Sequence, residues 1–336
     1  MIDLTYKLLD NSISSYLINK YPYGLAHGKM GICISLYNQS RLKQDHYLET
    51  LANHILDDIT CNLSKIKSID IENGLAGCAF GFLYLVKKGF IIGNLNKILH
   101  EFDVAIYKKI NQLKNGFEIY TLTQILFYFQ KRLTDTELKN EDKTLYYNLC
   151  MEFLNFIHTT IDSEYLREPY QHSILEYKLP SLLHILGIFL HDKMLSYKAE
   201  RMLVELTTEI ISFLPKSEFN KIALLWGMLS INNKRTYSLW REYIELLYHH
   251  IDINKMLTKE LKDQHIFFDN GAVGAYWLMK QINKLNTPYH FNIDKTMFDH
   301  KIYNSQAWNL MRNDPEYLQQ HLGLMHGYTG ILMAYK

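Results

Sequence analysis

The chain has 336 residues, and its 36 basic and 35 acidic residues give a formal net charge of +1. A balance this even gives no indication of a polyanionic partner, so we expect no binding to nucleic acid. Only six prolines occur, which leaves long stretches free to form helices, because proline ends helices.

The N-terminal stretch is not expected to be a signal peptide. Residues 1–17 lack a basic region followed by an apolar block, so they do not read as a signal peptide. The longest apolar runs, 78–86 and 179–190, are shorter than the roughly 20 residues that span a bilayer. The four cysteines are scattered and form no CxxC motif. We therefore expect a cytoplasmic protein without a membrane span.

The first distinctive motif in chain order begins at Ala26 and returns three times. Each copy has His or Asn, then Gly, two residues, a second Gly and an apolar, aromatic-rich run. The copies start at His27, Asn73, Asn270 and His326. His or Asn can cap a helix start, and two glycines three residues apart let another backbone approach that face. The motif predicts helix starts that converge around a common axis.

Degenerate copies are expected in the long gap between the second and third clear ones. They are the run 117–132, which has lost both glycines, the run 181–193, which keeps His184 and Gly187, and the run LLWGMLSI at 224–231, which keeps Gly227. Between the copies lie amphipathic segments, in which apolar residues recur every three or four positions. These segments are 46–66, 144–161 and 197–214.

The alternation of the two kinds of helix predicts about seven helical hairpins. We therefore expect an all-α fold, formed by a single domain over 1–336 that closes into an α/α toroid. An open solenoid of hairpins would fit the same repeats.

Three of the motif copies resemble repeats of a known family. The segments 24–37, 73–85 and 323–335 resemble the first, second and last repeats of the lanthionine synthetase C-like family, the zinc-dependent cyclases of lanthipeptide maturation. The resemblance implies the α/α toroid, a peptide partner and a zinc ion that activates a substrate thiol. The thiolate adds to a dehydroalanine or dehydrobutyrine of the peptide.

The resemblance also places the zinc ligands of the family on this chain. The family holds zinc through a Cys of the fifth repeat and a Cys-His pair of the sixth. Leu225, Asp269 and Asn270 fall at these positions. Leucine has no ligand atom, and Asp with Asn alone is a poor tetrahedral zinc set. We therefore expect no metal and no other cofactor.

Candidate catalytic residues are Glu118, His184 and Asp269. The first two fall at the positions of the aspartate and histidine that the family carries in its third and fourth repeats. Asp269 precedes a helix start, where an acid can act as general acid or base, bind a cation, or simply stabilise the helix. These alternatives stay open.

Six residues at or beside the repeat turns are candidates for substrate binding. They are His27, Trp226, Asn270, Tyr276, His326 and Tyr328. For the histidines we favour a helix-capping role over chemistry. For the aromatic residues we favour core packing over a wall that receives a peptide or sugar.

Three functions remain open at this point. We prefer a zinc-free family member that binds a precursor or modified peptide in a central cavity, as an accessory to a dehydratase or other peptide-maturation enzyme. The first alternative is a divergent active cyclase that adds Cys thiols to dehydrated residues. The second is a carbohydrate-active α/α-toroid enzyme that uses Asp269 and Glu118 as acid and base.

Overall fold

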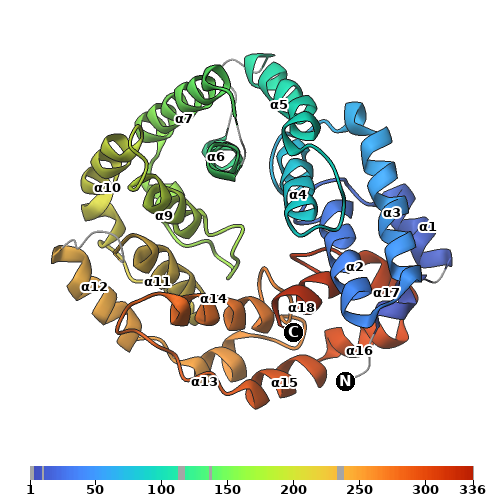
Figure 1. The fold of residues 1–336 in the computed structure, drawn as a ribbon. Coiled ribbons are helices and arrows are strands. Elements are labelled where there is room, and N and C mark those ends of the chain that lie inside the picture. Colours follow the sequence, from blue (N-terminus) through green and yellow to red (C-terminus); the bar gives the residue numbers. More distant parts are fainter. Residues whose placement is uncertain (1–3, 10, 113–117, 136–137, 233–237, 336) are drawn as a thin grey trace. The chain divides into compact units, whose positions relative to one another are not determined.

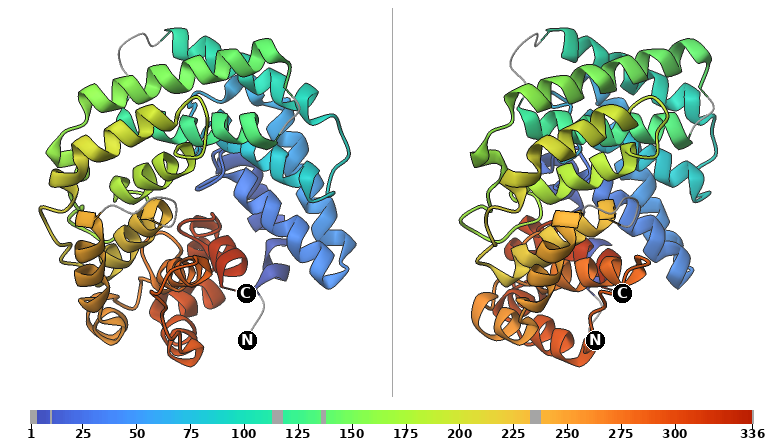
Figure 2. Two further views of the ribbon diagram at one scale, coloured as in Figure 1. Left: turned by 60° about the vertical axis from the view of Figure 1, so that its left-hand side comes forward. Right: turned by 90° about the vertical axis from the view of Figure 1, so that its left-hand side faces the viewer.

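The computed structural model describes residues 4–9, 11–112, 118–135, 138–232 and 238–335. Within these ranges every regular element is helical, and Figure 2 shows helices joined by loops in both views. No helix in these ranges is long and apolar enough to cross a bilayer. The chain forms two compact units, residues 1–142 with 309–334, and residues 143–308 with Tyr335. The expected single domain stays a prediction.

The first unit is built from pairs of adjacent helices. Its elements are the 3-10 helices η1 (Thr5–Leu9) and η2 (Leu63–Lys65) and the helices α1 (Asn11–Lys20), α2 (Lys29–Lys43), α3 (His46–Cys61), α4 (Leu75–Lys87), α5 (Leu95–Gln112), α6 (Ile119–Asp135), α17 (Pro315–Gln320) and α18 (Tyr328–Ala334). Helix α2 packs on α3 and α4 packs on α5, and both hairpins can be followed in Figure 1. Helix α2 also packs against α4 and α18.

The second unit repeats this arrangement. Its elements are α8 (Ser163–Leu166), α9 (Lys178–Phe189), α10 (Ser196–Ile210), α11 (Glu218–Asn232), α12 (Ser238–His249), α13 (Ile253–Lys255), the π-helix η3 (Met256–Glu260), α14 (Ala272–Lys284) and α15 (Lys295–Tyr303). The pairs α9–α10, α11–α12 and α14–α15 are in contact, and α11 packs between α9 and α14. Helices α7 (Asn140–Thr160) and α16 (Gln306–Asn313) contain the positions at which the chain passes from one unit to the other.

The three predicted amphipathic segments are confirmed as helices. They correspond to α3, α7 and α10, and the apolar repeats correspond to α2, α4, α6, α9, α11, α14 and α18. Their apolar positions are buried, as expected for a helix that turns one face to a core. Cys33 and Cys78 lie fully buried in α2 and α4 as free thiols.

The starts of α2, α4, α14 and α18 explain the paired glycines. Backbone N–H groups in the first turn donate to carbonyl groups seven residues earlier, so the preceding loop folds back over the helix start. The bonds run from Lys29 to Pro22, Met30 to Tyr23, Leu75 to Ser68, Ala76 to Ile69, Gly77 to Asp70, Ala272 to His265, Val273 to Ile266, Gly274 to Phe267, Tyr328 to His321 and Thr329 to Leu322. The N-cap residues of α2, α4 and α14 are glycines without a side-chain cap hydrogen bond. The expected capping of these helices by a His or Asn side chain is therefore wrong.

Both glycines of the first three copies and the first glycine of the last copy lie against the backbone of this capping loop. A methyl group added at Gly77 would overlap the carbonyl oxygen of Ile71, and one at Gly274 would overlap that of Phe268. The glycines therefore serve mainly the loop of their own repeat, whereas the sequence had suggested close approach between different helix starts.

The fourth and fifth repeats begin earlier than the sequence predicts. Helix α9 starts at Lys178 and α11 at Glu218, so His184 and Trp226 lie inside helices rather than at their starts. Gly227 instead lets α11 approach the backbone of Pro180 in α9, where an added methyl group would lie 2.8 Å from the Pro180 Cα atom. The predicted register was wrong because glycine serves helix crossing as well as helix starts.

Candidate functional site

Backbone hydrogen bonds join three capping loops of the first unit and bring two predicted site residues together. Ala26 N–H donates to the Glu72 carbonyl at 3.0 Å, and Met325 N–H donates to the Ala26 carbonyl at 2.9 Å. The residue after Ala26 and the residue after Met325 are therefore neighbours. These are His27 and His326, which the sequence proposes for substrate binding.

The two histidines form a stacked pair beside a carboxylate. Their ring centroids are 5.1 Å apart with an interplanar angle of 4°. His27 Nε2 lies 3.6 Å from Glu72 Oε2, and Glu72 Oε1 accepts a hydrogen bond from Gln124 Nε2 at 2.7 Å. Burial raises the pKa of Glu72, but hydrogen bonds from His27, Tyr120 and Gln124 outweigh it and lower the pKa below its usual range. Glu72 is therefore an anion at neutral pH.

A cavity of about 300 Å³ opens beside the two histidines. Tyr16, Lys20 and Tyr21 form part of its wall, and none of the eight lining residues is acidic. The Tyr21 hydroxyl donates to the Gln319 carbonyl at 2.8 Å and accepts from Leu322 N–H at 2.9 Å, which fixes its ring. The volume lies at the small end of ligand pockets and suits a group of about one residue.

In the second unit, Asp269 holds the loop that leads into α9. Only 3% of Asp269 is exposed. Its carboxylate accepts hydrogen bonds from Ser173 Oγ and from Leu175 N–H, both at 2.8 Å, and its carbonyl accepts from Ile174 N–H at 2.9 Å. The glycine motif is missing from the start of α9. There the Asp269 side chain, from the loop before α14, holds the preceding loop in place by hydrogen bonds. Asp269 is thus positioned to stabilise a loop.

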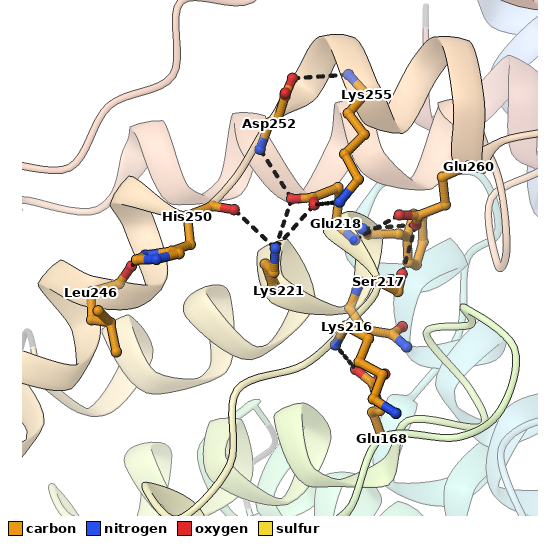
Figure 3. Close-up of polar contacts among 12 residues, drawn as sticks. Glu168, Lys216, Ser217, Glu218, Lys221, Leu246, His250, Asp252, Lys255 and Glu260 are labelled. Atoms are coloured by element: carbon orange, nitrogen blue, oxygen red, sulfur yellow. Dashed lines mark hydrogen bonds and ion pairs between the residues drawn. The ribbon is translucent and has the colours of Figure 1, made fainter.

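A carboxylate also replaces the glycine loop at the start of α11. Glu260 accepts hydrogen bonds from Ser217 Oγ at 2.6 Å, from Glu218 N–H at 2.7 Å and from Phe219 N–H at 3.1 Å. Figure 3 shows Glu260 beside Ser217 and Glu218. A negative charge at a helix start is favourable because it satisfies the unpaired N–H groups and the helix dipole.

The buried Glu218 is the centre of a second charge cluster in Figure 3. Its carboxylate pairs with Lys221 at 3.0 Å and with Lys255 at 2.6 Å, and it accepts from Asp252 N–H at 3.0 Å. Burial raises the pKa of Glu218, but these hydrogen bonds outweigh burial and lower the pKa below its usual range. The cluster joins α11 to the loop before α13.

This cluster predicts a pH-dependent stability. Because the folded pKa of Glu218 is lowered, its stabilisation is complete above the unfolded pKa of about 4.3 and is lost as pH falls through the folded pKa. Urea denaturation should show Glu218→Gln to be less stable than the unsubstituted chain at pH 7, by about 2 kcal/mol or more. The difference should shrink below pH 4. The exposed Glu245 gives the control variant Glu245→Gln, and a gap that is constant down to pH 3 would contradict the assignment.

An aromatic cluster is formed by residues of α9, α11 and α14 and of the loop before α14, and it includes two predicted residues. The rings of His184 and Trp226 are 4.6 Å apart, Trp226 and Trp277 are 5.9 Å apart, and Phe268 lies 5.1 Å from Trp277. All four side chains are half-buried. His184 and Trp226, which the sequence assigns to different roles, thus belong to one aromatic cluster.

The remaining predicted residues belong partly to the first unit and partly to the second. Glu118 is exposed and precedes α6 in the first unit. Tyr328 is 1% exposed in the core of the first unit, where its hydroxyl accepts from Leu4 N–H at 3.1 Å. Tyr276 packs in the second unit against Phe298 and against Tyr335, with ring centroids 5.4 Å and 4.7 Å away. Asn270 is half-buried, and its Oδ1 has no hydrogen-bond partner.

The residues at the zinc positions of the resembled family do not fit a zinc ion. Leu225 is fully buried inside α11 and offers no ligand atom. The Asp269 carboxylate accepts hydrogen bonds from Ser173 and Leu175. The Asn270 amide is then the one group at these three positions that is left to bind a metal. Within the described ranges no cluster of three or more His, Cys, Asp or Glu residues is arranged to hold a metal.

Sequence reasoning missed the other groups around the histidine pair. Glu72 directly precedes Asn73 in the second repeat, so its place in the motif was the available signal. Lys20 and Tyr21 belong to no motif. They reach the cavity because α1 packs on α17, a contact between segments almost 300 residues apart in sequence.

Comparisons with known proteins bear on the fold. No family model matches the chain, and no curated protein matches it. Among solved structures the chain is similar to nisin cyclase, with a TM-score of 0.64 and 15% sequence identity over 98% of this chain and 92% of that chain. The expected all-α fold class is confirmed, and it is the α/α-toroid class of nisin cyclase.

Proposed function

We propose that the protein binds a ribosomally made precursor peptide, or its modified product, in lanthipeptide maturation. The peptide binds at the cavity beside His27 and His326, and the protein works without zinc. The observation that carries the proposal is this cavity, which joins a histidine pair, a lysine and tyrosine rings in a chain with the fold of nisin cyclase. Peptides are bound through such mixtures of aromatic contact and polar anchors.

The zinc-free part of the proposal is supported by the side chains at the three ligand positions. A thiolate-activating zinc needs an open coordination site and several strong donors, which Leu225 and an engaged Asp269 do not supply. The protein therefore acts as a binding partner of a dehydratase or of another maturation enzyme. The alternative cyclase and the carbohydrate-active enzyme gain no support, because the Asp269 carboxylate is engaged by Ser173 and by the Leu175 N–H.

A binding experiment tests the proposal. The dehydrated nisin precursor, labelled with a fluorophore, serves as the probe, and fluorescence anisotropy gives its dissociation constant. We expect His326→Ala to weaken binding about tenfold, because the substitution removes one ring of the stacked pair that lines the cavity.

The control is His54→Ala, which removes an exposed histidine of α3 that does not line the cavity. It should leave the dissociation constant unchanged. Equal affinities for both variants would reject the cavity as the binding site. About one tightly held zinc per chain, measured by mass spectrometry of the purified protein, would reject the zinc-free proposal.

A further inference from the structure

One lysine, Lys20, is among the residues that line the cavity in the first unit. Lys20 is exposed at the end of α1 and forms no ion pair with any described residue. His27 and His326 line the same cavity. Glu72 does not line it, and its carboxylate is held by Gln124 and His27. The cavity therefore offers the Lys20 ammonium group to an anion, and none of the residues that line it is acidic.

The rest of the wall is suited to an apolar body. The rings of Tyr16 and Tyr21 meet edge to face with centroids 6.2 Å apart, and Pro22 lies beside them. Burial raises the pKa of Tyr21 to about 12, so its hydroxyl stays neutral. A volume of about 300 Å³ accommodates one residue with a bulky side chain but no long segment of a peptide.

We propose that this cavity binds the C-terminal residue of a peptide. The free α-carboxylate is held by Lys20 beside the histidine pair, and the side chain lies against Tyr16 and Tyr21. An internal residue has no charge at this place, whereas a chain end supplies both an anion and a side chain within one residue. This inference rests on the proposed peptide binding and adds which part of the peptide is recognised.

The test compares two probes that differ only at the chain end, N-acetyl-Gly-Phe and its C-terminal amide. Binding is followed by NMR titration of the histidine ring C–H signals of the full chain. The free acid should bind at least about tenfold more tightly than the amide, because a charge-assisted contact is lost in the amide. Lys20→Met should weaken binding of the acid about three- to tenfold and leave binding of the amide unchanged.

The matched control is Lys97→Met, which removes an exposed lysine of α5 that does not line the cavity. Equal binding of acid and amide would overturn the inference, as would equal effects of the two lysine variants or no binding of either probe. Displacement of the acid by an equal concentration of inorganic phosphate would also overturn it, because the cavity would then select any anion. If the dehydrated precursor still binds in these cases, the proposed peptide binding stands and only the proposed recognition of the chain end is rejected.

Discussion

Gly77→Ala and Gly274→Ala should each lower the free energy of unfolding by about 3–5 kcal/mol, as measured by urea denaturation at pH 7. The added methyl group at either position would overlap a backbone carbonyl oxygen of the capping loop, Ile71 in one case and Phe268 in the other. A backbone cannot move aside as a flexible side chain can. Accommodating the methyl group must therefore break the hydrogen bonds that join the loop to the helix start.

Gly323 provides the control for this prediction. A methyl group there would lie 3.4 Å from its nearest neighbour, the His27 Cα atom, which is an ordinary contact. Gly323→Ala should therefore change stability by less than about 1 kcal/mol. If Gly77→Ala were as stable as Gly323→Ala, the backbone-capped helix start would not be the reason for the paired glycines.

Asp269→Ala should lower the free energy of unfolding by about 2–4 kcal/mol. The substitution removes the acceptor of the buried Ser173 hydroxyl and of the part-buried Leu175 N–H, and a buried donor that loses its acceptor costs about 1–3 kcal/mol. Ser173→Ala removes only one of the two donors and should cost about 1–2 kcal/mol. Thermal and urea denaturation would measure both effects.

The comparison for Asp269 is Asp263→Ala. The Asp263 side chain is 75% exposed and lies 4.0 Å from Lys301, so its loss should change stability by no more than about 0.5 kcal/mol. If Asp269→Ala unfolded at the same urea concentration as Asp263→Ala, the Asp269 carboxylate would not be what stabilises the loop before α9. The catalytic role that the sequence suggests for Asp269 would then be favoured again.

The substrate-binding role of the candidate residues stays a prediction, but part of their arrangement could be anticipated from the sequence. His27 and His326 belong to the first and last repeats, and their equivalent positions in the motif made them candidates before the structure showed their rings stacked. Lys20 could not be predicted as a site residue, because nothing in the sequence near residue 20 shows that α1 packs on α17. His184 and Trp226 were expected at helix starts but lie inside α9 and α11. The sequence pattern misled because a glycine inside a helix cannot be told from a glycine at a helix start.

The sequence by itself determined the all-α fold class, the rhythm of alternating apolar and amphipathic helices and the four glycine-marked helix starts. These follow from local rules, namely the helical period of the apolar residues and the small size of glycine. Only the tertiary structure decided which carboxylates replace the glycine loop at α9 and α11 and which side chains surround the histidine pair. The reason is physical: hydrogen bonds between distant segments depend on how whole repeats pack, and no short window of sequence contains that packing.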